Sequence, residues 1–175
     1  MSKLALLGGQ ALFDHNELEI YNPIGKEEKN AVNDVMEDGN LSGYLANWGD
    51  GFLGGPEIRK FEKDWLEKFK VKHAVAVNSA TSGLIAAMGA IGINPGDEVI
   101  VPPISMSATS TAPLFYGGIP RFVDIEEDYF CLNPKLVKDA INSRTKAIIA
   151  VNIFGQPASL HELRKLADEN NIFLI

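Results

Sequence analysis

The chain of 175 residues has enough apolar side chains for one α/β unit with a sizeable core, since 46% are hydrophobic and 22% charged. Its formal net charge of -7 argues against nucleic acid or an acidic membrane surface as a partner, and no basic cluster offsets it. The single cysteine, Cys131, excludes an internal disulfide and suits a reducing compartment. No leader-like segment opens the sequence, and no apolar run is long enough to cross a bilayer. We therefore expect a cytoplasmic globular protein.

The first part of the chain predicts an arm followed by an amphipathic helix. Residues 1–22 show weak periodicity and contain Gly8 and Gly9, which favours an irregular N-terminal arm. From Lys26 onward the apolar residues fall on one helical face, and Gly39 stands where a left-handed C-terminal cap belongs. The pattern therefore predicts a helix that ends just before Gly39.

A glycine-rich loop and a second helix follow. Residues 41–55 contain many glycines and three aromatic side chains: Tyr44, Trp48 and Phe52. Two interpretations are open, because the aromatics can lie over a ligand or a neighbouring subunit, or the loop can fold on its own aromatics. Pro56 favours the first position of a helix, and the apolar residues from Ile58 to Phe69 form one stripe along it.

The segment from His73 predicts a strand, a polar turn and a helix. Residues 73–78 are rich in valine and alanine, as a buried strand is, and the alanine-rich residues 84–93 predict a helix buried on most sides. Ser79, Thr81 and Ser82 lie where the strand passes into the helix. Free N–H groups, hydroxyls and the positive end of the helix dipole make this an anion site, most naturally for a phosphate. The alternative is that Ser79 only caps the helix.

Strands and helices alternate in the rest of the chain. Predicted strands cover residues 98–101, 121–124, 146–151 and 172–175. We expect a short helix over residues 107–116 that Pro113 kinks or stops. Another helix should start at Pro134, and a third should follow a capping box formed by Ser159 and Glu162. This alternation predicts an α/β fold with a mainly parallel sheet and flanking helices.

Small polar residues follow three of the predicted strands. These segments are Ser79–Ser82, Ser105–Thr109 and Asn152–Gly155. Ligands of such sheets bind beyond the carboxyl ends of the strands, so the three segments together predict a site at that edge. The sequence contains neither a GxGxxG motif after a strand nor a GxxxxGK[ST] motif. Its single cysteine and three histidines, His15, His73 and His161, lack metal-ligand spacing.

A resemblance to a known family rests on two stretches, HAVAVNSATSGLIAAMGAIGINPGDEVIVPPISMSATSTAPLFYGGIPRFVDIEEDYFCLNP and TKAIIAVNIFGQPASLHEL. In order and spacing they resemble the DegT/DnrJ/EryC1/StrS aminotransferases. These are fold-type I pyridoxal-phosphate (PLP) enzymes that act mostly on nucleotide-linked keto-sugars. The similarity runs from about Pro23 to the last residue. It implies that residues 1–22 are an N-terminal arm and that residues 23–175 are the N-terminal part of the large PLP-transferase domain.

The resemblance implies cofactor contacts at six positions: Ser79, Ala80, Thr81, Ser82, Met106 and Asn152. Thr81 and Ser82 would bind the cofactor phosphate through backbone N–H and hydroxyl groups, while the two residues before them shape the turn. Met106 stands where the family usually has an aromatic residue stacked on the pyridine ring, and a thioether can cover a ring face with less fixed geometry. Asn152 stands where a histidine is common, near the edge of the cofactor.

The resemblance also implies that no catalytic residue lies within this chain. The sequence stops at Ile175, where the family continues with an E-D-x-A-Q type segment whose aspartate pairs with the pyridinium nitrogen. The lysine that forms the Schiff base lies further on in the family. The lysines present fall on predicted solvated helix faces or, for Lys146, at the start of a strand. We therefore expect a truncated domain that does not transaminate by itself.

Three functions are consistent with these features. The first is a PLP-dependent aminotransferase that moves an amino group from a donor such as glutamate to a nucleotide-linked keto-sugar, in polysaccharide or sugar biosynthesis. The second is a catalytically silent relative that binds a ligand or a regulatory partner. The third is a PLP-dependent sugar dehydratase, for which a histidine would replace the downstream lysine. The resemblance further implies a homodimer whose subunits share their active sites.

Overall fold

Two units, Met1–Ala74 and Val75–Ile175, make up the computed structural model, which describes residues 3–13, 21–44, 48–49 and 51–175. In the first unit a short 3₁₀-helix, η1 (Ala5–Leu7), lies in the predicted arm, and two α-helices follow it: α1 (Lys26–Asp38) and α2 (Pro56–Phe69). The predicted helix end is confirmed, because Gly39 adopts φ 72° and donates its N–H to the Val35 carbonyl at 3.2 Å.

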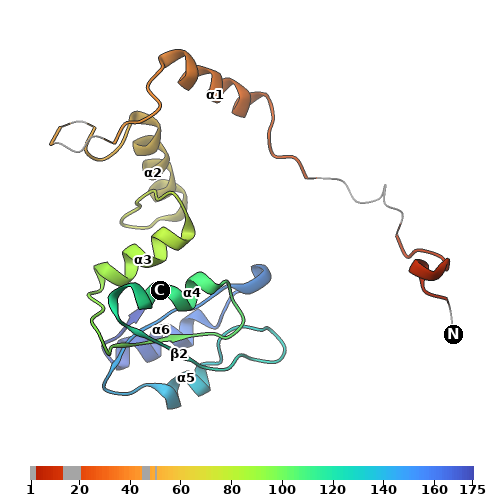
Figure 1. Ribbon diagram of the computed structural model, residues 1–175, viewed down its shortest axis with the longest axis vertical. Helices are drawn as coiled ribbons and strands as arrows, with labels where there is room; N and C mark the ends of the chain where they lie inside the picture. Colours follow the sequence, from red (N-terminus) through yellow and green to blue (C-terminus); the bar gives the residue numbers. More distant parts are fainter. Residues whose placement is uncertain (1–2, 14–20, 45–47, 50) are drawn as a thin grey trace. The chain divides into compact units, whose positions relative to one another are not determined.

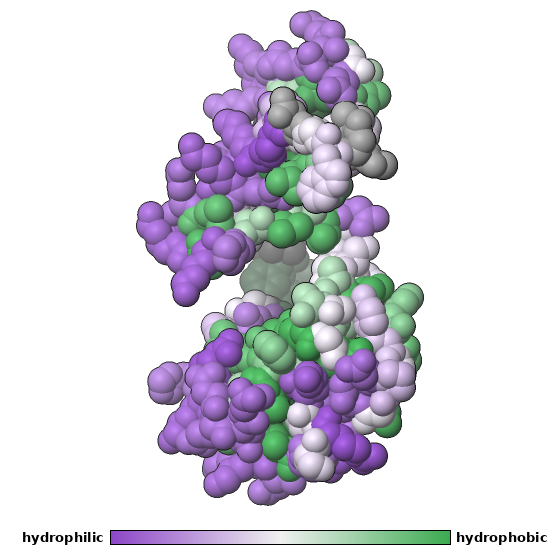
Figure 2. All heavy atoms as spheres, turned by 90° about the vertical axis from the view of Figure 1, so that its left-hand side faces the viewer, coloured by the Kyte–Doolittle hydropathy of each residue, from purple (hydrophilic) through white to green (hydrophobic). Residues whose placement is uncertain are grey.

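Five aromatic residues of the first unit form two clusters. Trp48 stacks on Phe52 with their ring centroids 4.3 Å apart, so these two aromatics of the glycine-rich loop contact each other. On α2, rings four residues apart touch, with centroids 5.8 Å apart for Phe61 and Trp65 and 4.4 Å for Trp65 and Phe69. The α2 rings are each about half exposed. Figure 2 shows apolar side chains at the surface of both units.

The second unit is built on a four-stranded parallel sheet, as the alternation of strands and helices predicts. Its strands, in the spatial order β2-β1-β3-β4, are β1 (Glu98–Val101), β2 (Ile119–Phe122), β3 (Thr145–Ile148) and β4 (Phe173–Leu174). All three neighbouring pairs are parallel. The connecting helices are α3 (Ala80–Ala90), α4 (Ser107–Thr111), η3 (Ala112–Tyr116), α5 (Pro134–Ala140), η4 (Ile153–Gly155) and α6 (Leu160–Glu169).

Side chains that alternate along the central strands bury both faces of this sheet. Val99 and Val101 of β1 join Met88 of α3 in one cluster. Ile100, between them in sequence, joins a cluster on the opposite face that includes Val137 of α5, Leu163 of α6 and Ile148 of β3. Figure 1 accordingly shows α3 and α4 on one side of the sheet and α5 on the other. A nearly continuous apolar pattern is what a parallel strand covered on both faces requires.

Residues 73–78, predicted as a buried strand, form no strand in the structure. The side chain of Val75 is 80% exposed, and that of Val77 is 49% exposed. A strand exists only through the hydrogen-bonded ladder with a neighbour, and the sheet of the described residues pairs its four strands without this segment. The helix that follows is present, but Met88 is its one buried residue, so the expectation of burial on most sides is also wrong.

Smaller differences concern strand limits and one helix cap. β2 begins two residues earlier than predicted, because Ile119 pairs with Glu98 at the start of β1. As an edge strand, β2 also accommodates Pro120. β3 covers residues 145–148 instead of 146–151.

The predicted capping box before α6 is wrong. Ser159 has ψ 58°, and its side chain makes no capping hydrogen bond. An N-cap residue needs extended backbone to place its hydroxyl under the first turn of the helix. The strand predicted at the C-terminal end is present as β4.

Candidate functional site

The N-terminus of α3 presents the predicted anion-binding groups. Ser79 is the N-cap residue, with extended backbone (φ -163°, ψ 158°). Its Oγ accepts the Ser82 N–H at 3.1 Å and lies 3.0 Å from the Ser82 Oγ. The N–H groups of Ala80 and Thr81 have no acceptor within residues 75–175, where every residue is described. Thr81 itself is exposed. The capping role of Ser79 is therefore confirmed, and the anion site stays a prediction that rests on two open N–H groups at the positive end of the helix.

The segment after β1 places an exposed thioether beside a pair of hydroxyls. Ser105 Oγ and Thr109 Oγ1 are 2.7 Å apart, and Thr109 is buried. Met106 lies between them in sequence, immediately before α4, and its side chain is 78% exposed. The hydroxyl pair fixes the backbone on either side of Met106, while the thioether is free to contact a ligand.

Asn152, after β3, uses its side-chain oxygen to hold a turn. Its Oδ1 accepts the backbone N–H of Ala158 at 2.9 Å. Ala158 is buried against the core formed with α6, so this bond ties the turn to the body of the unit. The Asn152 Nδ2 has no hydrogen-bond partner within the second unit and is available to a ligand.

The topology places these segments toward one edge of the sheet. β1 and β3 are parallel neighbours, so their carboxyl ends lie at the same edge of the sheet. Met106 follows the carboxyl end of β1, and Asn152 follows that of β3. α3 packs against α4, and its C-terminal end leads through the turn Asn94–Asp97 to the amino end of β1. The first turn of α3 is therefore directed toward the carboxyl edge. Parallel sheets of this kind bind their ligands at that edge.

The opposite edge of the sheet holds a buried charge. Glu98, 3% exposed, pairs with Arg144 and with the Arg121 Nη1 at 3.1 Å, and accepts a hydrogen bond from Asn142 Nδ2 at 2.8 Å. These partners, above all the Asn142 donor, hold the pKa of Glu98 below its usual value despite its burial. Because the cluster ties the amino ends of three strands together, its role is structural.

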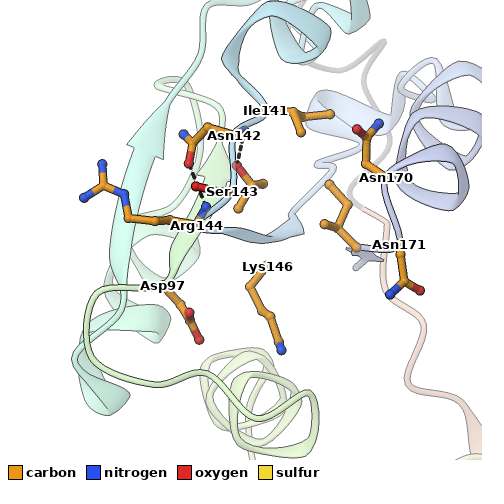
Figure 3. A pocket seen from close by; sticks show the side chains of 10 residues that line it. Asp97, Ile141, Asn142, Ser143, Arg144, Lys146, Asn170 and Asn171 are labelled. Carbon is orange, nitrogen blue, oxygen red and sulfur yellow. Dashed lines mark hydrogen bonds between the residues drawn. The ribbon is translucent and has the colours of Figure 1, made fainter.

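A polar cavity opens beside this cluster, as Figure 3 shows. Asp97, Asn142, Lys146 and Asn171 are among the residues that line it. The cavity lies at the amino ends of β1, β3 and β4, the edge opposite to the one at which these sheets bind ligands. The start of α3, Met106 and Asn152 therefore remain the candidate site.

The described residues also bear on metal and membrane sites. No group of three or more His, Cys, Asp or Glu side chains in this part of the chain could hold a metal ion. In the same residues, no helix has the length and apolar character needed to cross a membrane. Cys131 is a buried free thiol whose Sγ donates to the Gln156 carbonyl at 3.5 Å.

Comparison with known proteins identifies the family. Residues 23–175 match the model of the DegT/DnrJ/EryC1/StrS aminotransferase family. The chain belongs to this family. It is 36% identical over 152 residues to the spore coat polysaccharide biosynthesis protein SpsC of Bacillus subtilis, with 87% of this chain and 36% of that protein aligned. It is 36% identical over 159 residues to GDP-perosamine synthase of Vibrio cholerae, with 90% of this chain and 41% of that protein aligned.

Solved structures of the family share the fold of the described sheet and helices. DesV of S. venezuelae, in complex with a ketimine intermediate, is 35% identical with a TM-score of 0.74, over 85% of this chain and 38% of that chain. E. coli GDP-4-keto-6-deoxy-D-mannose-3-dehydratase with bound hydrated PLP is 26% identical with a TM-score of 0.74, over 88% and 38%. The chain therefore spans about two fifths of the length of these family members, and its fold is that of their N-terminal portion.

The structure reveals two features that the sequence analysis missed. Phe154 adopts a left-handed backbone conformation with an exposed ring, and no local signal distinguishes it from its neighbours. The Glu98 cluster could have been inferred from the charged residues Glu98 and Arg121 in two predicted apolar strands, because buried charges require partners.

Proposed function

We propose that the protein containing this chain is a PLP-dependent aminotransferase that transfers an amino group from a donor such as glutamate to a keto group of a nucleotide-linked sugar. The observation that carries the proposal is the start of α3, where the N–H groups of Ala80 and Thr81 and the hydroxyl of Thr81 are open to a phosphate. Family membership supplies the reaction class. The names of the relatives support a sugar substrate and a polysaccharide context.

The residues at the carboxyl edge fit the cofactor. The N–H groups of Ala80 and Thr81 and the hydroxyls of Thr81 and Ser82 would hold its phosphate, since the Ser82 N–H is already donated to Ser79. Met106 would cover one face of its ring, and Asn152 would contact the edge of the ring. PLP supplies an electron sink that stabilises negative charge on the carbon undergoing amino exchange. The contribution of this chain is to bind and orient: the cap made by Ser79 fixes the phosphate cup, and the Ser105–Thr109 hydroxyl pair fixes the backbone around Met106.

We place the Schiff-base lysine outside these 175 residues. Lys135, Lys138 and Lys165 of the second unit line a groove between α5 and α6, on the face of the sheet opposite α3. Lys146 lines the cavity at the amino edge. On this proposal the chain alone binds PLP weakly and does not transaminate. Borohydride trapping of PLP on the isolated chain tests it, and stoichiometric trapping at one lysine together with turnover would contradict it.

We further propose that the protein is a cytoplasmic homodimer. The resemblance of the sequence to this family supports a dimer with shared active sites, and the stacked rings of Trp48 and Phe52 are aromatic groups that the glycine-rich loop could offer to a second subunit. The buried free thiol of Cys131 suits a reducing compartment. Sedimentation of the PLP-loaded protein tests the dimer, and a fully active monomer at assay concentration would exclude it.

A sugar dehydratase is the second candidate, because the structural match to the 3-dehydratase is as good in TM-score as that to DesV. Incubation of the PLP-loaded protein with glutamate and a nucleotide-linked keto-sugar separates the possibilities. Amino-sugar formation with release of 2-oxoglutarate supports the aminotransferase. Loss of water from the sugar, with no amino group retained in it, supports the dehydratase. Absence of both reactions, with tight ligand binding, supports a silent regulatory relative.

A further inference from the structure

The turn that follows β3 is held rigidly by three hydrogen bonds. The Asn152 Oδ1 accepts the Ala158 N–H at 2.9 Å, and the Ile153 carbonyl accepts the Gln156 N–H at 2.9 Å. From the loop after β2, the Cys131 Sγ donates to the Gln156 carbonyl at 3.5 Å. Both Cys131 and Ala158 are buried in the same core cluster. The backbone between residues 152 and 158 is therefore anchored at both ends and in the middle.

Phe154, at the tip of this turn, combines a strained backbone with an exposed ring. Its φ of 54° and ψ of 22° lie in the left-handed region, which bulky side chains rarely occupy, and Gly155 follows at φ 81°. The residue as a whole is 85% exposed. Burial within this chain therefore does not offset the strain. Glycine or asparagine would suit the backbone better and would not expose an aromatic ring to water.

The combination of strain with nearly complete exposure indicates a contact made with something else, whereas Phe130, which is also left-handed, is only 46% exposed. The turn lies after the carboxyl end of β3, and Met106 follows the neighbouring strand β1 with a side chain that is 78% exposed. Two apolar side chains thus stand on adjacent loops at the ligand-binding edge. A flat aromatic ring best complements another flat ring, and stacking on a nucleobase is tolerant of base identity.

We propose that Phe154 is a substrate-binding residue that stacks on the base of the nucleotide-linked substrate. The inference rests on the proposed function for the nature of the substrate, since the GDP-perosamine synthase to which the chain is similar takes its name from a GDP-linked sugar. The rigid turn positions the ring in advance, so little conformational freedom is lost when the base binds.

Binding of nucleoside diphosphates to the PLP-loaded protein tests this proposal without requiring turnover. Titration calorimetry gives the Kd of GDP, UDP, dTDP and the base-free probe pyrophosphate for the wild type and for Phe154→Asn. We expect the Kd of the preferred nucleoside diphosphate to rise on the order of tenfold in the variant. The Kd of pyrophosphate should not change, because it has no base to stack.

A matched control comes from Phe130, which is also left-handed (φ 58°) and 46% exposed, on the loop after β2. Asparagine tolerates this backbone region, so Phe130→Asn and Phe154→Asn should each raise the melting temperature, by roughly 2–5 °C. Only Phe154→Asn should weaken nucleotide binding. Thermal stabilisation thus shows relief of strain, and the difference in Kd shows a ligand contact.

Several outcomes would overturn the proposal. An unchanged nucleotide Kd in Phe154→Asn would show that the ring does not contact the base. An equal rise in the Kd of pyrophosphate would show that the substitution affects binding of the phosphates. A lower melting temperature would show that the ring packs against protein. A wild type that binds none of the three diphosphates would also refute it. PLP content and amino transfer from glutamate are measured separately, so this failure is distinguishable from failure of the proposed function.

Discussion

Replacement of Glu98 by glutamine tests how the amino edge of the sheet is held together. The carboxylate is 3% exposed and has three partners: Arg121, Arg144 and Asn142. Glutamine keeps the shape and one acceptor oxygen but removes the charge that both guanidinium groups face. Breaking a fully buried ion pair costs about 3–5 kcal/mol. The two arginine side chains are 41% and 62% exposed and can regain water, so we expect a smaller loss.

The loss expected for Glu98→Gln is about 2 kcal/mol of unfolding free energy at neutral pH, close to the value of one hydrogen bond to a charged group. Urea unfolding followed by circular dichroism measures it. The matched control is Glu169→Gln, which removes an exposed pair with Lys165 at 3.9 Å and should cost less than about 0.5 kcal/mol. A loss no larger than that of the control would refute a stabilising role for the cluster.

The same pair of proteins should differ in their response to acid. The pKa of Glu98 is lowered in the folded state, chiefly by the Asn142 hydrogen bond, so its ionised form stabilises the fold above the unfolded pKa of about 4.3. This stabilisation is lost as the pH falls through the lower pKa that Glu98 has in the folded protein. The wild type should therefore lose its advantage over Glu98→Gln below about pH 4. If the unfolding free energies of the two proteins fell equally with pH in the acid range, this mechanism would be contradicted.

Three further predictions concern the carboxyl edge in the PLP-loaded protein. Thr81→Val removes a hydroxyl from the phosphate site and should weaken PLP binding by about 1.5–3 kcal/mol, so an unchanged PLP Kd would contradict the assignment. Met106→Phe should leave PLP binding equal or tighter, because an aromatic ring suits a ring-facing position, and a large loss would show that Met106 points elsewhere. Asn152→Ala deprives the Ala158 N–H of its acceptor and should lower unfolding free energy by about 1 kcal/mol, whereas Asn152→Asp, which keeps an acceptor, should lose less.

Much of the helical structure could be predicted from the sequence because the signals are local. Gly39 ends α1, Pro56 begins α2, and Asn133 caps α5 by accepting the Lys135 N–H at 3.0 Å. Each signal acts within a few residues, through a backbone conformation or a hydrogen bond that depends on no distant partner. The start of α3 belongs to the same class, because the Ser79 cap depends only on the residues directly around it.

Tertiary structure decided what depends on partners far along the chain. Residues 73–78 have the composition of a strand, yet a strand also needs a ladder, and no strand of the described sheet provides one. Ile119 belongs to β2 because Glu98 lies opposite it. The amino-acid composition of the two segments does not determine this register. Phe154 is left-handed because bonds from Asn152 and Cys131 impose the turn, against the preference of a bulky residue. Pairing, burial and imposed strain are long-range properties, and therefore only the fold determines them.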